Sequence, residues 1–226
     1  MKITKVEVQA KDKTRVNVYA DDNFFAGIDM DTCVKNGIKA GKEFNEEELS
    51  RIIFESECQR AMGKAAKYMA KALKTTKQIK DYLKTKGYEA DVIDYCISKL
   101  GEYNYLDDEA YVKAYIKDKG TSCGMHKLRA GLTKKGISSK LLDEAFENYE
   151  SNLDDIRKLA IKKLANKPRT YENLSKTFAF LSNRGFEYDD IKKVINELRE
   201  NDDESWDWFG RSKKVWKDGW ARQCTW

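Results

Sequence analysis

The residue types that most often perform chemistry in proteins are scarce and isolated in this sequence. His126 is the only histidine, so a metal site or a nucleophile paired with histidine would depend on one side chain. Its neighbours, from Gly124 to Arg129, indicate the exposed start of a helix, and an ordinary surface histidine is the better interpretation there. The histidine therefore predicts no catalytic site.

Two other short segments have the composition of a ligand site but not its pattern. Residues 120–124, Gly-Thr-Ser-Cys-Gly, lack the Gly-Lys-[Ser/Thr] ending of a phosphate-binding loop, and we expect no strand before them. The adjacent Asp107 and Asp108 have no further metal ligands nearby, and helix capping accounts for them. We therefore predict no catalytic residue, no metal and no cofactor.

Basic side chains are the stronger signal, and they point to binding. Lys64, Lys67, Lys71 and Lys74 recur at steps of three and four residues, which predicts one stripe along a helix. A solvated face explains any single lysine, but a bias that extends over several segments fits a polyanion or an acidic protein equally well. The candidate partner-binding residues are Lys64, Lys67, Lys71, Lys74, Lys127, Arg129, Arg157, Lys158, Lys162 and Lys163.

The elements that must position these side chains are indicated by a motif that occurs three times. The pattern Leu-x-x-[Lys/Arg]-Gly ends at Gly87, Gly136 and Gly185, which are spaced by 49 residues. A fixed period of this size is typical of tandem structural units. A glycine just past a helix end adopts a positive φ without a steric cost, so each motif predicts a helix followed by a tight turn.

The residues after each glycine predict a further helix in every unit. Ile93, Cys96, Ile97 and Leu100 fall at i, i+3, i+4 and i+7, which is one apolar face of a helix. The same pattern returns 49 and 98 residues later, up to Leu198. With a helix before each motif, every unit is predicted to contain three helices. Tyrosines among the basic residues of the first unit, such as Tyr68, Tyr82 and Tyr88, are explained by core packing before base stacking.

The first part of the chain differs from the repeats. Valines at 6, 8, 16 and 18 alternate with polar residues, as in half-buried strands, and Asn45 can cap a helix that continues into the first repeat. The predicted fold is mainly α, with tandem three-helix, helix-turn-helix-like repeats after a small β-rich module. The predicted segments are the β-rich module 1–44, the connecting helix with repeat 1 at 45–105, repeat 2 at 106–150, repeat 3 at 151–199, and a tail at 200–226.

The tail contains all five tryptophans. Two interpretations are open: it is the first helix of an unfinished fourth repeat, or it is a flexible or artefactual terminus.

Composition and charge distribution limit the class of protein. The 226 residues carry a net charge of +5 and include one proline, which favours helix. Residues 60–105, 109–150 and 154–199 have net charges of +5, +2 and +4, whereas residues 1–59 have −3. No apolar run approaches the roughly 20 residues of a membrane helix. The five cysteines are scattered, so we predict a cytoplasmic, disulfide-free protein that does not bind membranes.

The motifs together resemble the RecX family of regulatory proteins. The segments that carry the resemblance are 82–88 (Tyr-Leu-x-x-Lys-Gly-Tyr), 105–111 (Tyr-Leu-Asp-Asp-x-Ala-Tyr) and 132–137 (Leu-x-x-Lys-Gly-Ile). The match is strongest over about residues 60–150. Two positions differ: Gly124–Leu128 lacks the arginines that the family often has there, which leaves that contact surface in question, and Asn104 replaces a common glycine.

The resemblance implies both a shape and a role. It implies an elongated, basic, monomeric molecule of tandem three-helix units that is not an enzyme. It also implies that the protein binds the filament of the RecA recombinase, with single- or double-stranded DNA as a further partner, and holds down the ATPase and strand-exchange activities of RecA. The alternatives are a protein that binds DNA directly through its helix-turn-helix-like units, and a plain helical scaffold.

Overall fold

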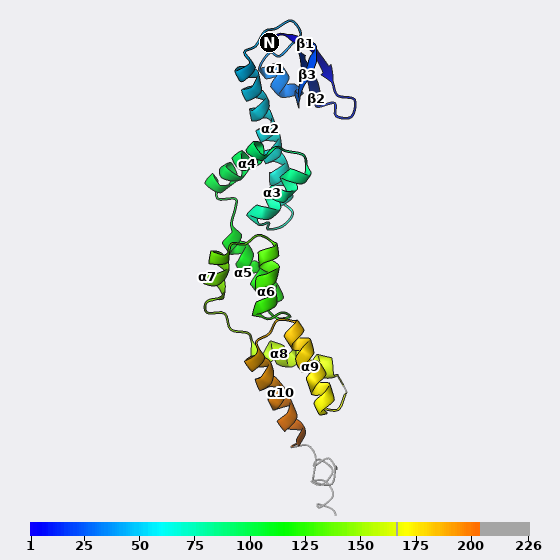
Figure 1. Cartoon of the computed structure of the whole chain (residues 1–226), viewed down its shortest axis with the longest axis vertical. Coiled ribbons are helices and arrows are strands. Elements are labelled where there is room, and N and C mark those ends of the chain that lie inside the picture. The colour runs from blue at the N-terminus through cyan, green and yellow to red at the C-terminus, as the bar shows by residue number, and fades with distance from the viewer. Residues whose placement is uncertain (166, 204–226) are drawn as a thin grey trace, which may run out of the picture. The chain divides into compact units, whose positions relative to one another are not determined.

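The computed structural model describes residues 1–165 and 167–203, and the chain divides into two compact units between Asp108 and Glu109. All five tryptophans, and with them both interpretations of the tail, lie outside the described residues. The remaining architecture is mainly helical, with a three-stranded antiparallel sheet at the start of the chain (Figure 1).

The N-terminal sheet forms as the alternation of valines predicts. The strands β1 (Ile3–Val8), β2 (Arg15–Ala20) and β3 (Asn23–Asp29) pair in the order β1-β2-β3, and the short helix α1 (Met30–Lys35) follows. Val16 and Val18 are buried, whereas Val8 at the end of β1 is exposed. Asp21 and Asp22 connect β2 to β3 with φ of 48° and 64°, the left-handed conformation that a two-residue hairpin turn needs.

The helix α2 (Glu46–Met69) contributes to two cores. Asn45 caps it by accepting a hydrogen bond from the amide of Glu47 at 3.1 Å. Leu49 and Ile52 are buried with the sheet, whereas Ala61 and Ala65 are buried with the helices of repeat 1. Because one continuous helix carries both sets of residues, it joins the sheet to repeat 1 without a hinge.

Ion pairs fasten the middle of α2 to the sheet. Arg15 of β2 contacts Glu57 at 2.6 Å, and Arg60 contacts Asp29 at 3.3 Å. Both arginine side chains are less than a quarter exposed, so these contacts are partly shielded from water. They hold α2 in one orientation on the sheet.

Three-helix repeats follow, as the period predicts, and each has its own apolar core. The third helix of each repeat buries the start of the face that the spacing indicates; Ile93, Leu142 and Ile191 are all buried. In repeat 2 the helix ends at Phe146, so Tyr149, the last position of the predicted face, lies beyond it. The predicted segment limits stay predictions. Beyond the end of α2, the helices are α3 (Thr76–Thr85) and α4 (Ala90–Glu102) in repeat 1; α5 (Asp108–Lys119), α6 (Met125–Lys134) and α7 (Ser139–Phe146) in repeat 2; and α8 (Leu153–Leu164), α9 (Tyr171–Asn183) and α10 (Tyr188–Asp203) in repeat 3.

The three glycine turns have one geometry. Gly87, Gly136 and Gly185 have φ of 82°, 84° and 81°. In the first turn, the amide of Tyr88 donates to the carbonyl of Leu83 and the amide of Gly87 donates to Lys84, and the same pair of bonds recurs in the other two. This is the Schellman arrangement, which satisfies carbonyl groups at a helix end. The prediction of a left-handed glycine after each middle helix is confirmed.

Within the second unit, repeats 2 and 3 contact each other through backbone. The amide of Gly124 donates to the carbonyl of Arg184 at 2.9 Å, and the amide of His126 donates to Gly185 at 3.2 Å. The Arg184 side chain donates in return to the carbonyl of Ser122 at 2.9 Å. The turn that ends α9 thereby satisfies the amides that α6 leaves unpaired at its start.

Candidate functional site

The lysine stripe that the sequence predicts in repeat 1 is only partly helical. Lys64 and Lys67 lie on α2, but α2 ends at Met69, so Lys71 and Lys74 lie in the loop before α3. The prediction of one helical stripe is therefore wrong. The capping box formed by Thr75 and Gln78 starts the new helix α3. The residues between Met69 and Thr75 therefore form the loop that connects α2 to α3.

Tyrosine rings hold some of these lysines. The rings of Tyr68 and Tyr82 are stacked with centroids 4.2 Å apart, and the ammonium groups of Lys74 and Lys86 lie 4.9 and 5.4 Å from the ring centroids of Tyr68 and Tyr82 respectively. Both tyrosines also pack against the core of repeat 1, as predicted. Cation–π contacts of this kind contribute about 0.5–1 kcal/mol at exposed sites, so Lys74 has a preferred position on its own repeat.

Lys64 also contacts a tyrosine ring, whereas Lys67 and Lys71 have no such contact among the described residues. The Lys64 ammonium group lies 5.1 Å from the ring centroid of Tyr88, and the side chain is half-buried. Lys67 and Lys71 are exposed and, within the described part of the chain, lie beside no carboxylate within 4.0 Å. Lys67 and Lys71 are therefore the members of this group that are most accessible to a partner.

In repeat 2, Lys127 and Arg129 lie on α6 but differ in their surroundings. Arg129 forms an ion pair with Asp143 of α7 and lies 5.8 Å from the ring centroid of Phe146. Lys127 is exposed and has no carboxylate neighbour within 4.0 Å among the described residues. Arg129 thus connects two helices of its own repeat, and Lys127 is the more accessible charge.

Repeat 3 divides its basic residues in the same manner. Arg157 contacts Glu197 of α10 at 2.7 Å and also pairs with Asp154, and Lys158 lies 3.6 Å from Asp155. Exposed pairs of this kind contribute little to stability. The candidate cations that are exposed and lack a carboxylate within 4.0 Å among the residues in the structure are Lys67, Lys71, Lys127, Lys162 and Lys163.

Some residues at the basic surface of repeat 3 are not indicated by the spacing of lysines in the sequence. Lys167, Asn173 and Lys176 line a recess of about 410 Å³ in repeat 3 together with Lys163. They come from α8, from the following loop and from α9, so no periodic pattern connects them. The local signal in the sequence is the group of basic residues around Pro168, with Lys162, Lys163 and Lys167 before it and Arg169 directly after it.

A second recess, of about 660 Å³, lies on α2 and α4 of repeat 1 and is more apolar. Phe54 and Tyr95 meet edge to face there with ring centroids 5.8 Å apart, and Met62 lies beside them. Tyr95 and Tyr103 are both exposed. These aromatic residues fall between the core positions of the repeat, so the spacing of apolar residues does not indicate them.

The segments considered for catalysis have structural roles. Residues 120–124 connect α5 to α6, and Asp108 accepts a hydrogen bond from the amide of Thr76 at 2.8 Å, which satisfies the start of α3. His126 lies 3.1 Å from Glu187, in the contact between repeats 2 and 3. Over residues 1–165 and 167–203, no group of three or more His, Cys, Asp or Glu side chains could hold a metal ion, and no helix is long and apolar enough to cross a membrane.

Tandem three-helix repeats after a small antiparallel sheet define a class of mainly helical repeat proteins. Comparison with protein families makes this specific. Residues 1–45 match the regulatory protein RecX N-terminal domain, residues 61–100 match the first three-helix domain of RecX, and residues 150–195 match its third three-helix domain. The chain belongs to the RecX family.

Individual relatives cover nearly the whole chain. The regulatory protein RecX of Clostridium botulinum (strain Eklund 17B / Type B) is 36% identical over 202 residues, which are 87% of this chain and 95% of the relative. That of Clostridium perfringens (strain SM101 / Type A) is 36% identical over 207 residues, 89% and 98% of the two chains. Regulatory proteins are therefore the relatives of this chain, as the sequence motifs imply.

Two solved structures have a similar fold. A crystal structure of regulatory protein RecX gives a TM-score of 0.62 at 23% identity and covers 87% of this chain and 98% of its own. The crystal structure of RecX from Lactobacillus salivarius gives 0.58 at 25% identity and covers 63% and 97%. These likenesses support the tandem three-helix architecture.

Proposed function

We propose that this protein binds the filament of the RecA recombinase and lowers its ATPase and strand-exchange activities. The observation that carries the proposal is membership of the RecX family over almost the whole chain, with relatives that are named regulatory proteins. RecA as the target follows from the resemblance of the repeat motifs to that family. We also propose that the protein is not an enzyme, that it is a monomer and that it acts in the cytoplasm.

The accessible cations support a negatively charged partner. A RecA filament on DNA carries phosphate groups and acidic side chains. Lys67 and Lys71 in repeat 1, and Lys162 and Lys163 in repeat 3, are exposed. Opposed charges chiefly accelerate the encounter of two macromolecules and make it sensitive to salt. We expect these lysines to act in this way, and expect Arg129 and Arg157 to act mainly within their own repeats.

The test is a titration of the DNA-dependent ATPase activity of RecA with this protein. We expect inhibition below one molecule per RecA protomer, because a regulator that lies along or at the end of a filament affects more than one protomer. Unchanged ATPase activity at an equimolar ratio would contradict the proposal. The control repeats the titration with single-stranded DNA in large excess over both proteins.

A protein that binds DNA directly is the second candidate, and the same exposed lysines favour it. Such a protein would inhibit RecA only by withdrawing DNA, so excess DNA would abolish the inhibition. It would also bind bare DNA with an affinity that falls steeply as salt rises, because each neutralised phosphate releases a counterion. Inhibition that persists in excess DNA supports binding to the filament instead.

A further inference from the structure

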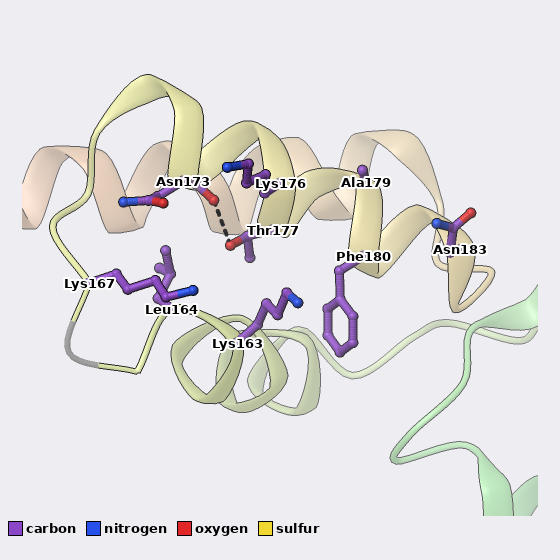
Figure 2. A pocket seen from close by; sticks show the side chains of 9 residues that line it. All are labelled: Lys163, Leu164, Lys167, Asn173, Lys176, Thr177, Ala179, Phe180 and Asn183. Atoms are coloured by element: carbon purple, nitrogen blue, oxygen red, sulfur yellow. Dashed lines mark hydrogen bonds between the residues drawn. The ribbon is translucent and has the colours of Figure 1, made fainter.

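A recess in repeat 3 gathers positive charge between α8 and α9. Its volume is about 410 Å³, within the range of pockets that hold small organic molecules. Figure 2 shows that Lys163 and Lys167 extend into the space between the two helices, and that Thr177 and Phe180 point toward it from α9. The complete lining is Lys163, Leu164, Lys167, Asn173, Lys176, Thr177, Ala179, Phe180 and Asn183.

The charges of this recess are not balanced by its own carboxylates. Lys176 lies 2.6 Å from Glu172, and this is an exposed pair within one turn of α9. Lys163 and Lys167 lie beside no carboxylate within 4.0 Å in the described part of the chain. Cations that line one recess repel one another, and an anion bound there relieves that repulsion.

The aromatic ring of Phe180 gives the Lys163 ammonium group a preferred position. The Lys163 ammonium group lies 5.2 Å from the ring centroid, and the Arg184 guanidinium group lies 4.7 Å from it. Arg184 is fixed in turn by its hydrogen bond to the carbonyl of Ser122. The cation–π contacts therefore keep positive charge at the edge of the recess before any ligand arrives.

Neutral groups complete the lining. The amide nitrogen of Asn173 donates to the carbonyl of Pro168 at 2.8 Å, which orients that side chain. The Asn183 amide has no hydrogen-bond partner among the described residues and can donate to a ligand. Phe180 and Ala179 supply apolar surface next to these polar groups, whereas Leu164 is almost wholly buried. The recess thus combines cations, amide donors and an apolar surface.

We propose that this recess binds a nucleotide: Lys163 and Lys167 hold its phosphate, and Phe180 and Ala179 contact its base or sugar. Lysine is well suited to phosphate because its ammonium group donates in three directions as a point charge. The nucleotide belongs either to a single strand or to a free mononucleotide. This proposal goes beyond RecA binding and does not rest on it.

The size of the recess favours a nucleotide over the side chain of an acidic protein partner. One carboxylate could meet one or two of the ammonium groups, but it would leave most of the 410 Å³ empty and the apolar surface uncovered. A nucleotide brings a phosphate, polar base edges and an apolar face in one ligand. Each of these matches a group that the lining provides.

The experiment measures binding of a fluorescein-labelled oligothymidylate of about 15 nucleotides to the full-length protein by fluorescence anisotropy. The test variant is Lys163→Gln/Lys167→Gln, which removes two charges and keeps a polar side chain with part of the apolar stem. The matched control is Lys192→Gln/Lys193→Gln on α10, which removes two exposed charges of the same repeat outside the recess. Circular dichroism checks that both variants are folded.

We expect the test variant to bind the oligonucleotide about tenfold more weakly, and the control to change less than twofold. Loss of two phosphate contacts should also reduce the slope of log Kd against log salt concentration by about 1.4. Asn183→Asp, which adds a negative charge to the recess without changing its size, should weaken binding as well. If thymidine monophosphate competes with the oligonucleotide, a free nucleotide is a ligand of the recess. If it does not compete, the recess binds a nucleotide only as part of a strand.

Three results would overturn the proposal. The first is equal loss of binding in the test variant and the control, which would show that only net charge matters. The second is failure of the wild-type protein to bind both the oligonucleotide and thymidine monophosphate. The third is weaker binding to RecA filaments by the test variant with unchanged nucleotide binding, which would assign the recess to an acidic protein surface.

Discussion

The amide of His126 donates a hydrogen bond to the carbonyl of Gly185 at 3.2 Å, so the turn that ends α9 caps the start of α6. These residues belong to different repeats and lie far apart in the sequence. The positive end of one helix therefore meets the negative end of another, which is a favourable arrangement of helix dipoles. The two backbones can approach this closely because Gly124 and Gly185, one on each side of the contact, have no Cβ atom.

The first prediction concerns Gly124→Ala. A Cβ atom at this position would lie 2.2 Å from the carbonyl oxygen of Gly185, which is backbone and cannot move alone. We expect the urea midpoint to fall by an amount corresponding to at least about 2 kcal/mol. We also expect faster hydrogen exchange of the His126 amide, because the contact with repeat 3 must open.

Gly101→Ala is the matched control for this substitution. Gly101 lies within α4, and a Cβ there would meet nothing within 4 Å. Alanine should therefore stabilise the helix slightly, by up to about 1 kcal/mol. Equal urea midpoints for the two variants would mean that repeats 2 and 3 do not meet at Gly124.

The second prediction separates the strain of a left-handed turn from the contact between repeats. Gly87 and Gly185 have φ of 82° and 81°, but a Cβ at Gly87 would meet nothing within 4 Å, whereas one at Gly185 would lie 2.5 Å from the amide nitrogen of Lys127. Gly87→Ala should cost about 1–2 kcal/mol from the backbone alone. Gly185→Ala should cost clearly more, as measured by urea unfolding followed by circular dichroism. A smaller loss for Gly185→Ala than for Gly87→Ala would contradict the interlocked geometry.

The third prediction concerns the accessible lysines of repeat 1. Lys67→Glu/Lys71→Glu should weaken binding to RecA filaments at least about tenfold at low salt, because both side chains are exposed and unpaired within the described chain. The difference should shrink at high salt, which screens exposed charges. A filament-binding titration at two salt concentrations measures both effects.

Lys117→Glu/Lys134→Glu is the control for the charge reversal. These lysines of repeat 2 are also exposed, so the change in net charge is the same. We expect a much smaller effect, because repeat 2 has the smallest positive excess. If both double variants bind filaments like the wild-type protein, the interface lies elsewhere, and the lysines of repeat 3 become the next candidates.

The fourth prediction concerns the stability of repeat 1 at high pH. Burial raises the pKa of the Cys58 thiol to about 11, with a smaller contribution from Cys96, and burial raises the pKa of Cys96 to about 11 as well. The ordinary value is 9.0, so between pH 9 and 11 the unfolded chain releases these protons and the folded chain retains them. The stability that the neutral thiols contribute is thus fully present below pH 9 and is lost as pH rises toward 11.

The measurement compares urea midpoints at pH 8 and pH 10 for the wild-type protein and for Cys58→Ala/Cys96→Ala. The variant should be less stable at pH 8 because it leaves small cavities. Its midpoint should nevertheless fall less between the two pH values, since tyrosines and lysines titrate in both proteins and only the wild type has these two thiols. An equal fall in both proteins would show that the thiols do not remain neutral in the folded state.

Much of the fold was determined by the sequence, because its signals are local. A glycine after Leu-x-x-[Lys/Arg] predicts a left-handed turn from the steric freedom of one residue, and Gly87, Gly136 and Gly185 all have it. The spacing of Ile93, Leu142 and Ile191 predicts buried helix faces, because helical period depends only on neighbours within two turns. The family resemblance followed from the same short motifs.

The candidate surfaces depended on the tertiary structure. Lys71 and Lys74 continue the spacing of a helix that has already ended, and no periodicity distinguishes a loop lysine from a helical one. Arg157 is neutralised by Glu197, 40 residues away in the sequence, whereas Lys163 lies beside no carboxylate within 4.0 Å in the described part of the chain. The path of the chain decides which charges meet, because an exposed lysine contributes too little energy to constrain that path.

The contact between Gly124 and Gly185 shows the same division. The sequence determined that Gly185 ends a helix, since that requires only its own φ. The structure alone decided that the turn also caps α6, because two backbone segments far apart in the sequence meet only through the packing of repeats 2 and 3. Local propensities act over a few residues, whereas packing between repeats depends on the summed burial of many side chains.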